Sequence, residues 1–383
     1  MLYIRPGTHA LTLLQLLSVA GEFPVRALSI LGSQRTLQEL VHRLEDRHTI
    51  EVSWSGKQYC ARLLSISGKR GPMRNIRLHK SALPILDELH PAALDYYLSA
   101  FRNHTFSGKR GEIARNHRVA ESLAMMLASG IAMQPYLLPQ LQTTRIEPTM
   151  GDRPCYYPSR IIKKLDDDSM NKTGFTRMTG LLLRQGVGFV VYNTRSAVMK
   201  WHGNGELKAM QQCEELARRN AGVDALNGAI LFGQNGTVAL ETLMEARKAG
   251  YRDYRIDRIY PAVHFVPLEG AGKSLLRFLT IPALQARLRS VLFPPRLQIN
   301  GFAECDCDAM DNGKYILSHL DGDLARLARF RLAAMEDGAH RFEAVCYPWQ
   351  LAYVRPFLGE RIALKVIDPA RIAAALQGVT HIE

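Results

Sequence analysis

The chain has 383 residues, of which 47% are hydrophobic and 22% are charged, so it is long enough for two or three cores and too apolar for a disordered protein. Its formal net charge is +13, and residues 1–118 hold 17 Lys and Arg against 9 Asp and Glu. Such an excess predicts a polyanionic partner. Because the sequence has no long basic amphipathic helix, nucleic acid is favoured over a membrane surface.

The apolar run at residues 10–20, preceded by Arg5, has the composition of a signal peptide. Thr12, Gln15 and Ser18 recur in it at every third position, however, and form a polar stripe that a signal peptide lacks. We therefore expect a first helix here. No other apolar run reaches the roughly 20 residues of a membrane span. Six scattered cysteines are typical of reduced thiols, so we expect a cytoplasmic protein without a membrane partner.

The segment 33–44 has the spacing of an amphipathic helix. Its apolar positions recur at i, i+3, i+4 and i+7, at Leu37, Leu40, Val41 and Leu44. Ser33 precedes them and is a good N-cap, because its hydroxyl can accept a hydrogen bond from a first-turn N–H group. Phe23–Leu31 predicts a second short helix, with Gly32 as the turn between the two. The later helix turns outward the residue types that bond base edges and phosphates: Gln34, Arg35, Gln38, His42 and Arg43.

Three strand-like segments follow, at His48–Ser53, Gln58–Ile66 and Asn75–Leu78. Between the last two lies a loop with Gly and Pro that carries three cations, Lys69, Arg70 and Arg74. Helix, turn, helix and a basic β-ribbon is the order of a winged helix, in which the second helix enters the major groove and the wing rests on the backbone. The alternative is that the helices only pack a core and the cations are solvated. We favour the winged helix.

Further helices are predicted at Ser81–Leu89, Ala92–Phe101 and Glu112–Ser129. The stretch Asn103–Arg118 is basic and loop-like. It is predicted to be a linker or a second DNA contact through Lys109 and Arg110. Pro135–Pro158 contains several prolines and no clear period, so it predicts a long loop.

Strand and helix patterns alternate through the rest of the chain. Thr179–Leu183 and Val187–Tyr192 are joined by a Gly-containing turn, which predicts a hairpin. The later alternation predicts an α/β (α+β) fold with a mixed sheet. We expect three domains, namely a winged-helix DNA-binding domain at 1–102, an α/β domain at 103–268 and a C-terminal α/β domain or extension at 269–383. No internal repeat is visible in the sequence.

Three short motifs invite a chemical interpretation, and each has a simpler one. The GAGKS sequence at residues 270–274 ends like a phosphate-binding loop, but Pro267 stands where that motif needs a glycine. Cys305 and Cys307 lack a second Cys or His pair at the spacing of a zinc site. Asp166–Asp168 are adjacent, so their side chains diverge. We expect no metal site, no cofactor and no catalytic residue.

The basic winged helix, the helix around Asn116-His117-Arg118-Val119-Ala120 and the hairpin Thr179–Tyr192 leading toward Lys200 and Lys208 together resemble the replication-relaxation family of plasmid and conjugative-element proteins. The resemblance covers residues 8–220. It implies a winged helix joined to a domain similar to a restriction-endonuclease core, and a role in plasmid replication or in relaxation of DNA at transfer origins.

An active core of that kind would place an acid at the end of the first hairpin strand and an acid-x-lysine set on the next, where they hold magnesium. Neither Phe175–Met178 nor Val190–Arg195 contains an acid. The resemblance therefore implies a degenerate endonuclease-like domain that grips DNA or a partner without cutting.

The sequence predicts a sequence-specific DNA-binding accessory protein of a mobile genetic element. It would mark a site on double-stranded DNA and recruit a relaxase, a replication initiator or a coupling ATPase, as a monomer or an oligomer. One alternative is a metal-dependent nuclease or nickase that uses Glu206, Lys208 and one of Asp166–Asp168. The other is a winged-helix transcriptional regulator with a ligand- or partner-sensing C-terminal domain.

Overall fold

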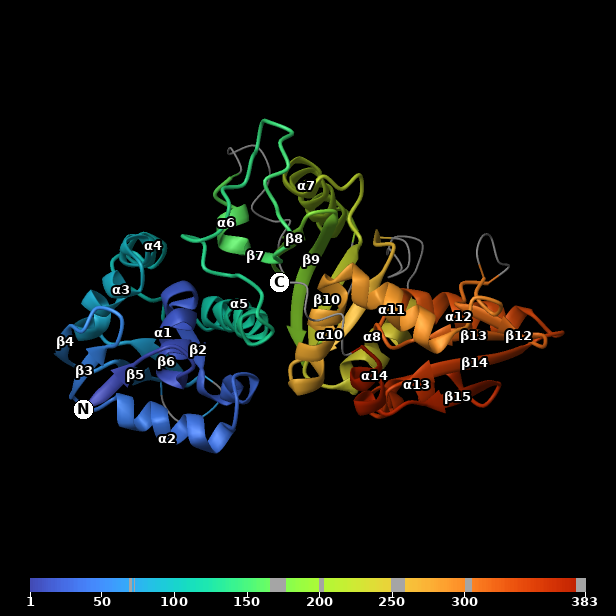
Figure 1. The fold of residues 1–383 in the computed structure, drawn as a ribbon, viewed down its shortest axis with the longest axis horizontal. Coiled ribbons are helices and arrows are strands. Elements are labelled where there is room, and N and C mark those ends of the chain that lie inside the picture. The colour runs from blue at the N-terminus through green and yellow to red at the C-terminus, as the bar shows by residue number, and fades with distance from the viewer. Residues whose placement is uncertain are drawn as a thin grey trace. The chain divides into compact units, whose positions relative to one another are not determined.

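The computed structural model describes residues 1–68, 71, 73–165, 177–199, 203–248, 259–299 and 305–376. The chain forms two compact units (Figure 1). Unit 1 comprises Met1–Leu141 and Arg153–Asp167, and unit 2 comprises Gln142–Asp152 and Asp168–Glu383. Helices and mixed sheets occur together, as an α/β fold requires. The three-domain division of the sequence stays a prediction.

Unit 1 is built around the helix α1. Its helices are α1 (His9–Ala20), α2 (Gln34–Leu44), α3 (Leu83–Leu89), α4 (Pro91–Ala100), α5 (Arg110–Ala128) and α6 (Ser159–Ile162), with two short 3-10 helices, η1 (Val25–Ile30) and η2 (Lys80–Ala82). Leu13 and Leu17 of α1 are fully buried, and α1 contacts both α4 and α5. Thr8 caps α1, because its hydroxyl accepts a hydrogen bond from the N–H of Leu11.

The strands β1–β6 of unit 1 form two sheets. Their bounds are β1 (Leu2–Ile4), β2 (Glu22–Pro24), β3 (His48–Val52), β4 (Gln58–Ala61), β5 (Leu64–Ser67) and β6 (Asn75–Leu78). One sheet has the order β1-β3-β4, with β1 parallel to β3. The other has the order β2-β6-β5 and is antiparallel. A further strand, β7 (Cys155–Pro158), begins at a bridge between Ala132 and Cys155.

The prediction of one helix at Phe23–Leu31 is wrong. Glu22–Pro24 is strand β2, which pairs with β6, and only Val25–Ile30 is helical, as a 3-10 helix. The ladder to β6 supplies the hydrogen bonds that a helix would otherwise make, so tertiary pairing outweighs local helix preference here.

The prediction of one strand at Gln58–Ile66 is also wrong. The segment breaks at Arg62 and Leu63, and its two halves, β4 and β5, belong to different sheets. The N–H of Leu63 donates to the carbonyl of Leu44 at 3.1 Å instead of to a strand partner. The chain therefore leaves one sheet and joins the other at this point.

Unit 2 contains two sheets with the same topology. The strands are β8 (Met178–Arg184), β9 (Val187–Arg195), β10 (Gly228–Gly233) and β11 (Val263–Pro267) in the first sheet, and β12 (Ala309–Asp311), β13 (Lys314–Ser318), β14 (Arg341–Cys346) and β15 (Ile362–Val366) in the second. In each, an antiparallel hairpin is followed by two strands parallel to its second strand. The predicted hairpin of β8 and β9 is confirmed, whereas β12 and β13 were not predicted.

The helices of unit 2 follow the same repeat. They are α7 (Gly203–Ala221), α8 (Gly236–Lys248), α10 (Gly270–Thr280), α11 (Pro282–Leu292), α12 (Leu324–Glu336), α13 (Leu351–Leu358) and α14 (Pro369–Leu376), with a short 3-10 helix, η3 (Pro348–Gln350). α7 and α8 connect β9, β10 and β11 in the same way as α12 and α13 connect β13, β14 and β15. The equivalent helices α8 and α13 pack against each other. The described elements therefore repeat one order twice, which the sequence does not reveal.

Among the described residues, no helix combines the length and the apolar composition that crossing a bilayer requires. The same residues contain no group of three or more His, Cys, Asp or Glu side chains placed to hold a metal ion.

Candidate nucleic-acid interface

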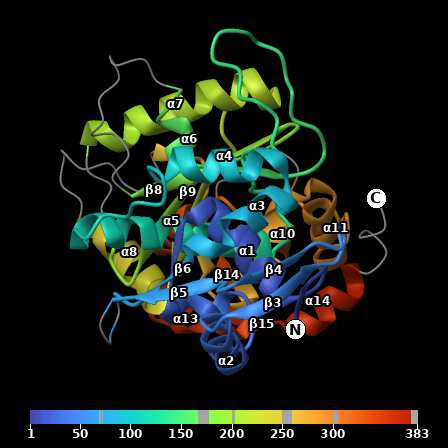
Figure 2. The same ribbon diagram turned by 90° about the vertical axis from the view of Figure 1, so that its left-hand side faces the viewer.

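The helix α2 has one buried and one outward face. Leu37, Val41 and Leu44 are buried against η1 and β5, as their spacing predicts, and Leu40 is half-buried. The C-terminal end of α2 is attached to β5, because the Glu45 carboxylate accepts a hydrogen bond from the N–H of Ile66 at 3.0 Å. In both views of the ribbon, α2 lies along the lower edge of unit 1 (Figures 1 and 2).

The predicted outward residues of α2 do not all have the same environment. Arg35, His42 and Arg43 are exposed, and Gln38 is half-buried. Gln34 is half-buried, and its Nε2 donates to the carbonyl of Val25 at 3.2 Å. Gln34 therefore joins α2 to η1, and its amide nitrogen is already engaged inside the unit.

Ser33 occupies the predicted N-cap position, but its side chain makes no capping hydrogen bond. Its backbone carbonyl does accept from the N–H of Leu37 at 3.0 Å, which begins the helix. Because the Ser33 hydroxyl is exposed, it is accessible to a partner at the start of α2.

The exposed cations of α2 have weak intramolecular partners. Arg35 Nε lies 3.0 Å from Glu39 Oε1, and His42 Nδ1 lies 3.3 Å from Glu45 Oε2. Exposed pairs of this kind contribute only about 0.2–1 kcal/mol, so a phosphate can replace the carboxylate at little energetic expense. The Arg43 guanidinium has no hydrogen-bond or ion-pair partner within the described part of the chain.

The loop between β5 and β6 holds the predicted wing cations. Lys69 and Arg70 lie outside the described residues. Arg74 is half-buried at the end of the loop, where its N–H donates to the carbonyl of Gly71 at 3.2 Å. Its carbonyl accepts from the N–H of Val25 at 3.0 Å, so this end of the loop is attached to η1 by the backbone of Arg74.

The loop predicted at Asn103–Arg118 extends only to Lys109, because the helix α5 begins at Arg110. Lys109 is the N-cap of α5 and Arg110 is its first residue. Both are exposed, and Lys109 Nζ lies 4.0 Å from Glu112 Oε1. The prediction failed beyond Lys109 because the polar composition of residues 110–118 masks the start of this helix. Its apolar face is formed by Ile113, Ala120 and Leu123.

A buried polar network joins α5 to the sheet β2-β6-β5, and the sequence did not predict it. Arg77 donates through Nε and Nη2 to Glu22 Oε2 at 3.2 and 2.8 Å, and Asn75 Nδ2 approaches the same oxygen at 3.4 Å. Asn116 Nδ2 donates to Glu22 Oε1 at 3.0 Å. One carboxylate on β2 therefore fixes both β6 and α5.

His117 extends this network with a defined tautomer. Its Nδ1 lies 3.3 Å from Arg26 Nη2, and its Nε2 bonds Asn75 Oδ1. Because a guanidinium only donates, Nδ1 is the acceptor and the proton is on Nε2. Burial, with a contribution from the positive charge of Arg26, lowers the pKa of His117 to about 4.

Of the residues in the nuclease alternative, Glu206 and Lys208 lie in the described part of the chain and have different environments. Glu206 is buried near Tyr192, and burial raises the pKa of its carboxyl group. Lys208, two residues along α7, is exposed. Asp166–Asp168 lie outside the described residues. Side chains two apart on a helix point in different directions, so Glu206 and Lys208 do not form one site.

The GAGKS sequence does not form a phosphate-wrapping loop. It is the first turn of α10, with the N–H of Lys273 donating to the carbonyl of Glu269 at 3.4 Å. Cys305 and Cys307 flank Asp306, whose carboxylate pairs with Arg326 and Arg329 of α12 at 2.8 and 2.7 Å. This segment is held to α12 by its aspartates.

Comparisons of the chain with protein-family models, with curated proteins and with solved structures find no match in any of the three.

Proposed function

We propose that unit 1 binds double-stranded DNA as a winged helix. The observation that carries this proposal is the order of elements along unit 1. The helix α1 is followed by β2, then by η1 and α2, and later by β5 and β6, and these three strands form the antiparallel sheet β2-β6-β5. That is the order in which a winged helix presents a recognition helix and a wing. The strands β3 and β4 would then be an insertion between the recognition helix and the wing.

In this proposal each predicted residue has one role. Arg35, Gln38, His42 and Arg43 face the major groove, where Arg and Gln form paired hydrogen bonds with base edges. Ser33 lies at the start of the same helix. Gln34 orients that helix through its hydrogen bond to the carbonyl of Val25. The wing and the start of α5 contact phosphates through Lys69, Arg70, Arg74, Lys109 and Arg110.

We also propose that unit 2 contains the endonuclease-like domain that the family resemblance implies. The hairpin β8–β9, the helix α7 and the parallel strand β10 follow one another in an order that is compatible with such a domain. The strand β9 has the sequence VGFVVYNTR and carries no acid. The whole protein would therefore mark a site on the DNA of a mobile element and recruit replication or relaxation proteins without cutting.

The test is binding of the purified protein to labelled fragments of its neighbouring DNA, at two salt concentrations, with and without Mg²⁺. We expect tight, site-selective binding that leaves the DNA intact. Replacing Lys69, Arg70 and Arg74 together with alanine should weaken binding to every fragment. It should also reduce the slope of log K against log salt concentration by about 0.9 for each phosphate that the variant no longer neutralises.

The matched control replaces three exposed cations of unit 2, Arg287, Lys365 and Arg371, with alanine. This variant carries the same change of net charge and should keep the original slope. An unchanged slope in the wing variant would contradict the assignment of the wing. Cleavage of the DNA on addition of Mg²⁺ would instead support the nuclease alternative.

A further inference from the structure

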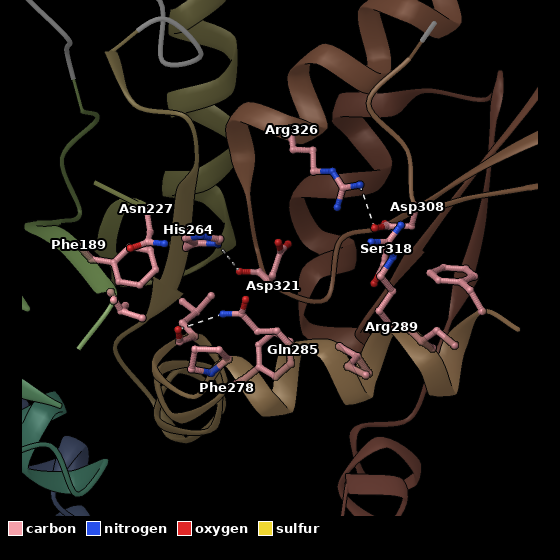
Figure 3. A pocket seen from close by; sticks show the side chains of 17 residues that line it. Phe189, Asn227, His264, Phe278, Gln285, Arg289, Asp308, Ser318, Asp321 and Arg326 are labelled. Carbon is pink, nitrogen blue, oxygen red and sulfur yellow. Dashed lines mark hydrogen bonds and ion pairs between the residues drawn. The ribbon is translucent and has the colours of Figure 1, made fainter. Parts of the chain in front are cut away.

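A cavity of about 470 Å³ lies within unit 2 (Figure 3). Its lining comes from both sheets, with His264 from β11 and Ser318 from the end of β13, and from the helices α10, α11 and α12. The turn after β13 contributes Asp321. This volume is in the usual range of small-molecule sites.

One side of the cavity is apolar. The helices α10 and α11 contribute Phe278, Leu279, Leu288 and Leu292, and Phe293 follows α11. Leu279, Leu288 and Phe293 are buried. On the opposite side, Phe189 packs its ring edge-to-face with His264, with the ring centres 5.7 Å apart. The body of a ligand in this space would therefore be apolar.

Part of the polar lining is satisfied by internal contacts. Asp308 accepts a hydrogen bond from the N–H of Ser318 at 2.6 Å and pairs with Arg326 at 2.9 Å. Arg326 also pairs with Asp306 at 2.8 Å. The positive charge of Arg326 is thus balanced by two carboxylates, which leaves it little capacity for a ligand anion.

The Asp321 carboxylate remains available as an acceptor. His264 Nδ1 lies 3.0 Å from the carbonyl oxygen of Asp321, and a carbonyl only accepts, so Nδ1 carries the proton. Asp321 Oδ1 accepts from the N–H of Asp323 at 3.1 Å, but within the described residues the Asp321 carboxylate has no ion pair. Figure 3 shows this carboxyl group between His264 and Arg326.

A carboxylate beside an apolar surface defines the ligand chemistry. An ammonium group has three N–H donors and a positive charge, and it complements a carboxylate. Burial raises the pKa of the Asp321 carboxyl group, and a bound cation would relieve the energetic penalty of ionising it there. Arg289, which also lines the cavity, is exposed and already donates a hydrogen bond to the carbonyl of Ile299 at 2.9 Å.

We propose that this cavity binds a small protonated amine with an apolar, ring-sized body, held by the Asp321 carboxylate. The apolar part of the ligand packs against α10 and α11. The site is independent of the DNA-binding role proposed for unit 1.

The test compares three probes of similar shape by isothermal titration calorimetry with the full chain: 2-phenylethylamine, 2-phenylethanol and 3-phenylpropionate. We expect the amine to bind at least tenfold more tightly than the alcohol, and the carboxylate not to bind. Equal affinity for all three probes, no binding of the amine at millimolar concentration, or tightest binding of the carboxylate would each overturn the proposal.

Two variants of the cavity sharpen this test. Asp321→Asn removes the charge but keeps an oxygen that can accept from the N–H of Asp323, so we expect an intact fold and at least a tenfold loss of amine affinity. Asp224→Asn, at an exposed position outside the cavity, should bind the amine like the original protein. Leu292→Trp should fill the cavity and abolish binding without changing any charge. Unchanged amine binding in Asp321→Asn would contradict the role of the carboxylate.

Discussion

Replacing Glu22 with alanine is expected to lower the free energy of unfolding of unit 1 by about 3–5 kcal/mol, because it leaves a buried ion pair without its acceptor. The Glu22 side chain is 1% exposed and that of Arg77 is 21% exposed, so solvent cannot replace the missing carboxylate at Arg77. Asn116 loses its acceptor at the same time. Hydrogen exchange of the slowest amides in β6 and α5 measures the effect, with acceleration of about 10²-fold or more expected.

The matched control is a second Glu–Arg pair in the same unit. Arg35 and Glu39 of α2 lie 3.0 Å apart, but their side chains are 89% and 66% exposed. Glu39→Ala should therefore change the free energy of unfolding by no more than about 0.5 kcal/mol. If both substitutions have the same small effect, the Glu22 network is not a structural link between α5 and the sheet.

Sequence patterns within a single segment were sufficient to predict some of the helices. The helix α2 follows from the spacing of Leu37, Val41 and Leu44, which are all buried. The helices α11 (Pro282–Leu292) and α14 (Pro369–Leu376) both begin at a proline, and Pro at the first helical position is a strong start signal that the sequence displays.

One missed element had a visible signal. Asn312 and Gly313 separate β12 from β13, and both have positive φ, at 49° and 71°. Two such residues form the turn that suits a two-residue hairpin, and Asn-Gly is its preferred sequence. The flanking strands are short, so the alternation of apolar and polar residues was too brief to be recognised.

Other features depend on contacts that no local pattern contains. Glu22 meets Arg77 and Asn116, which lie 55 and 94 residues further along the chain. The cavity of unit 2 draws its lining from residues between Gly186 and Arg326. The repeat in unit 2 is one of strand order and direction, which different sequences can adopt, so it has no sequence period.

Both units are expected to lose stability as the pH falls from about 6.5 to 4, because each contains a buried neutral histidine. Burial lowers the pKa of His117 in unit 1 to about 4 and that of His319 in unit 2 to about 3. An unfolded chain protonates its histidines near pH 6.5, whereas the folded chain does so only below pH 4. The stabilisation is therefore complete above pH 6.5. About 3 kcal/mol is lost for each histidine by pH 4.

Hydrogen exchange at pH 7 and pH 4.5, corrected for the intrinsic rates, separates the two contributions by unit. His117→Gln keeps one donor and one acceptor for Asn75 and Arg26 but cannot titrate, so it should flatten the pH dependence of α5 and β6 alone. His319→Gln, at the residue whose Nε2 lies 2.9 Å from the Tyr353 hydroxyl, should do the same for β13 and β14. If the loss at low pH persists in both variants, protonation of carboxylates such as Asp306 is its cause, because the positive charges of Arg326 and Arg329 hold the pKa of this carboxyl group below its ordinary value in the folded chain.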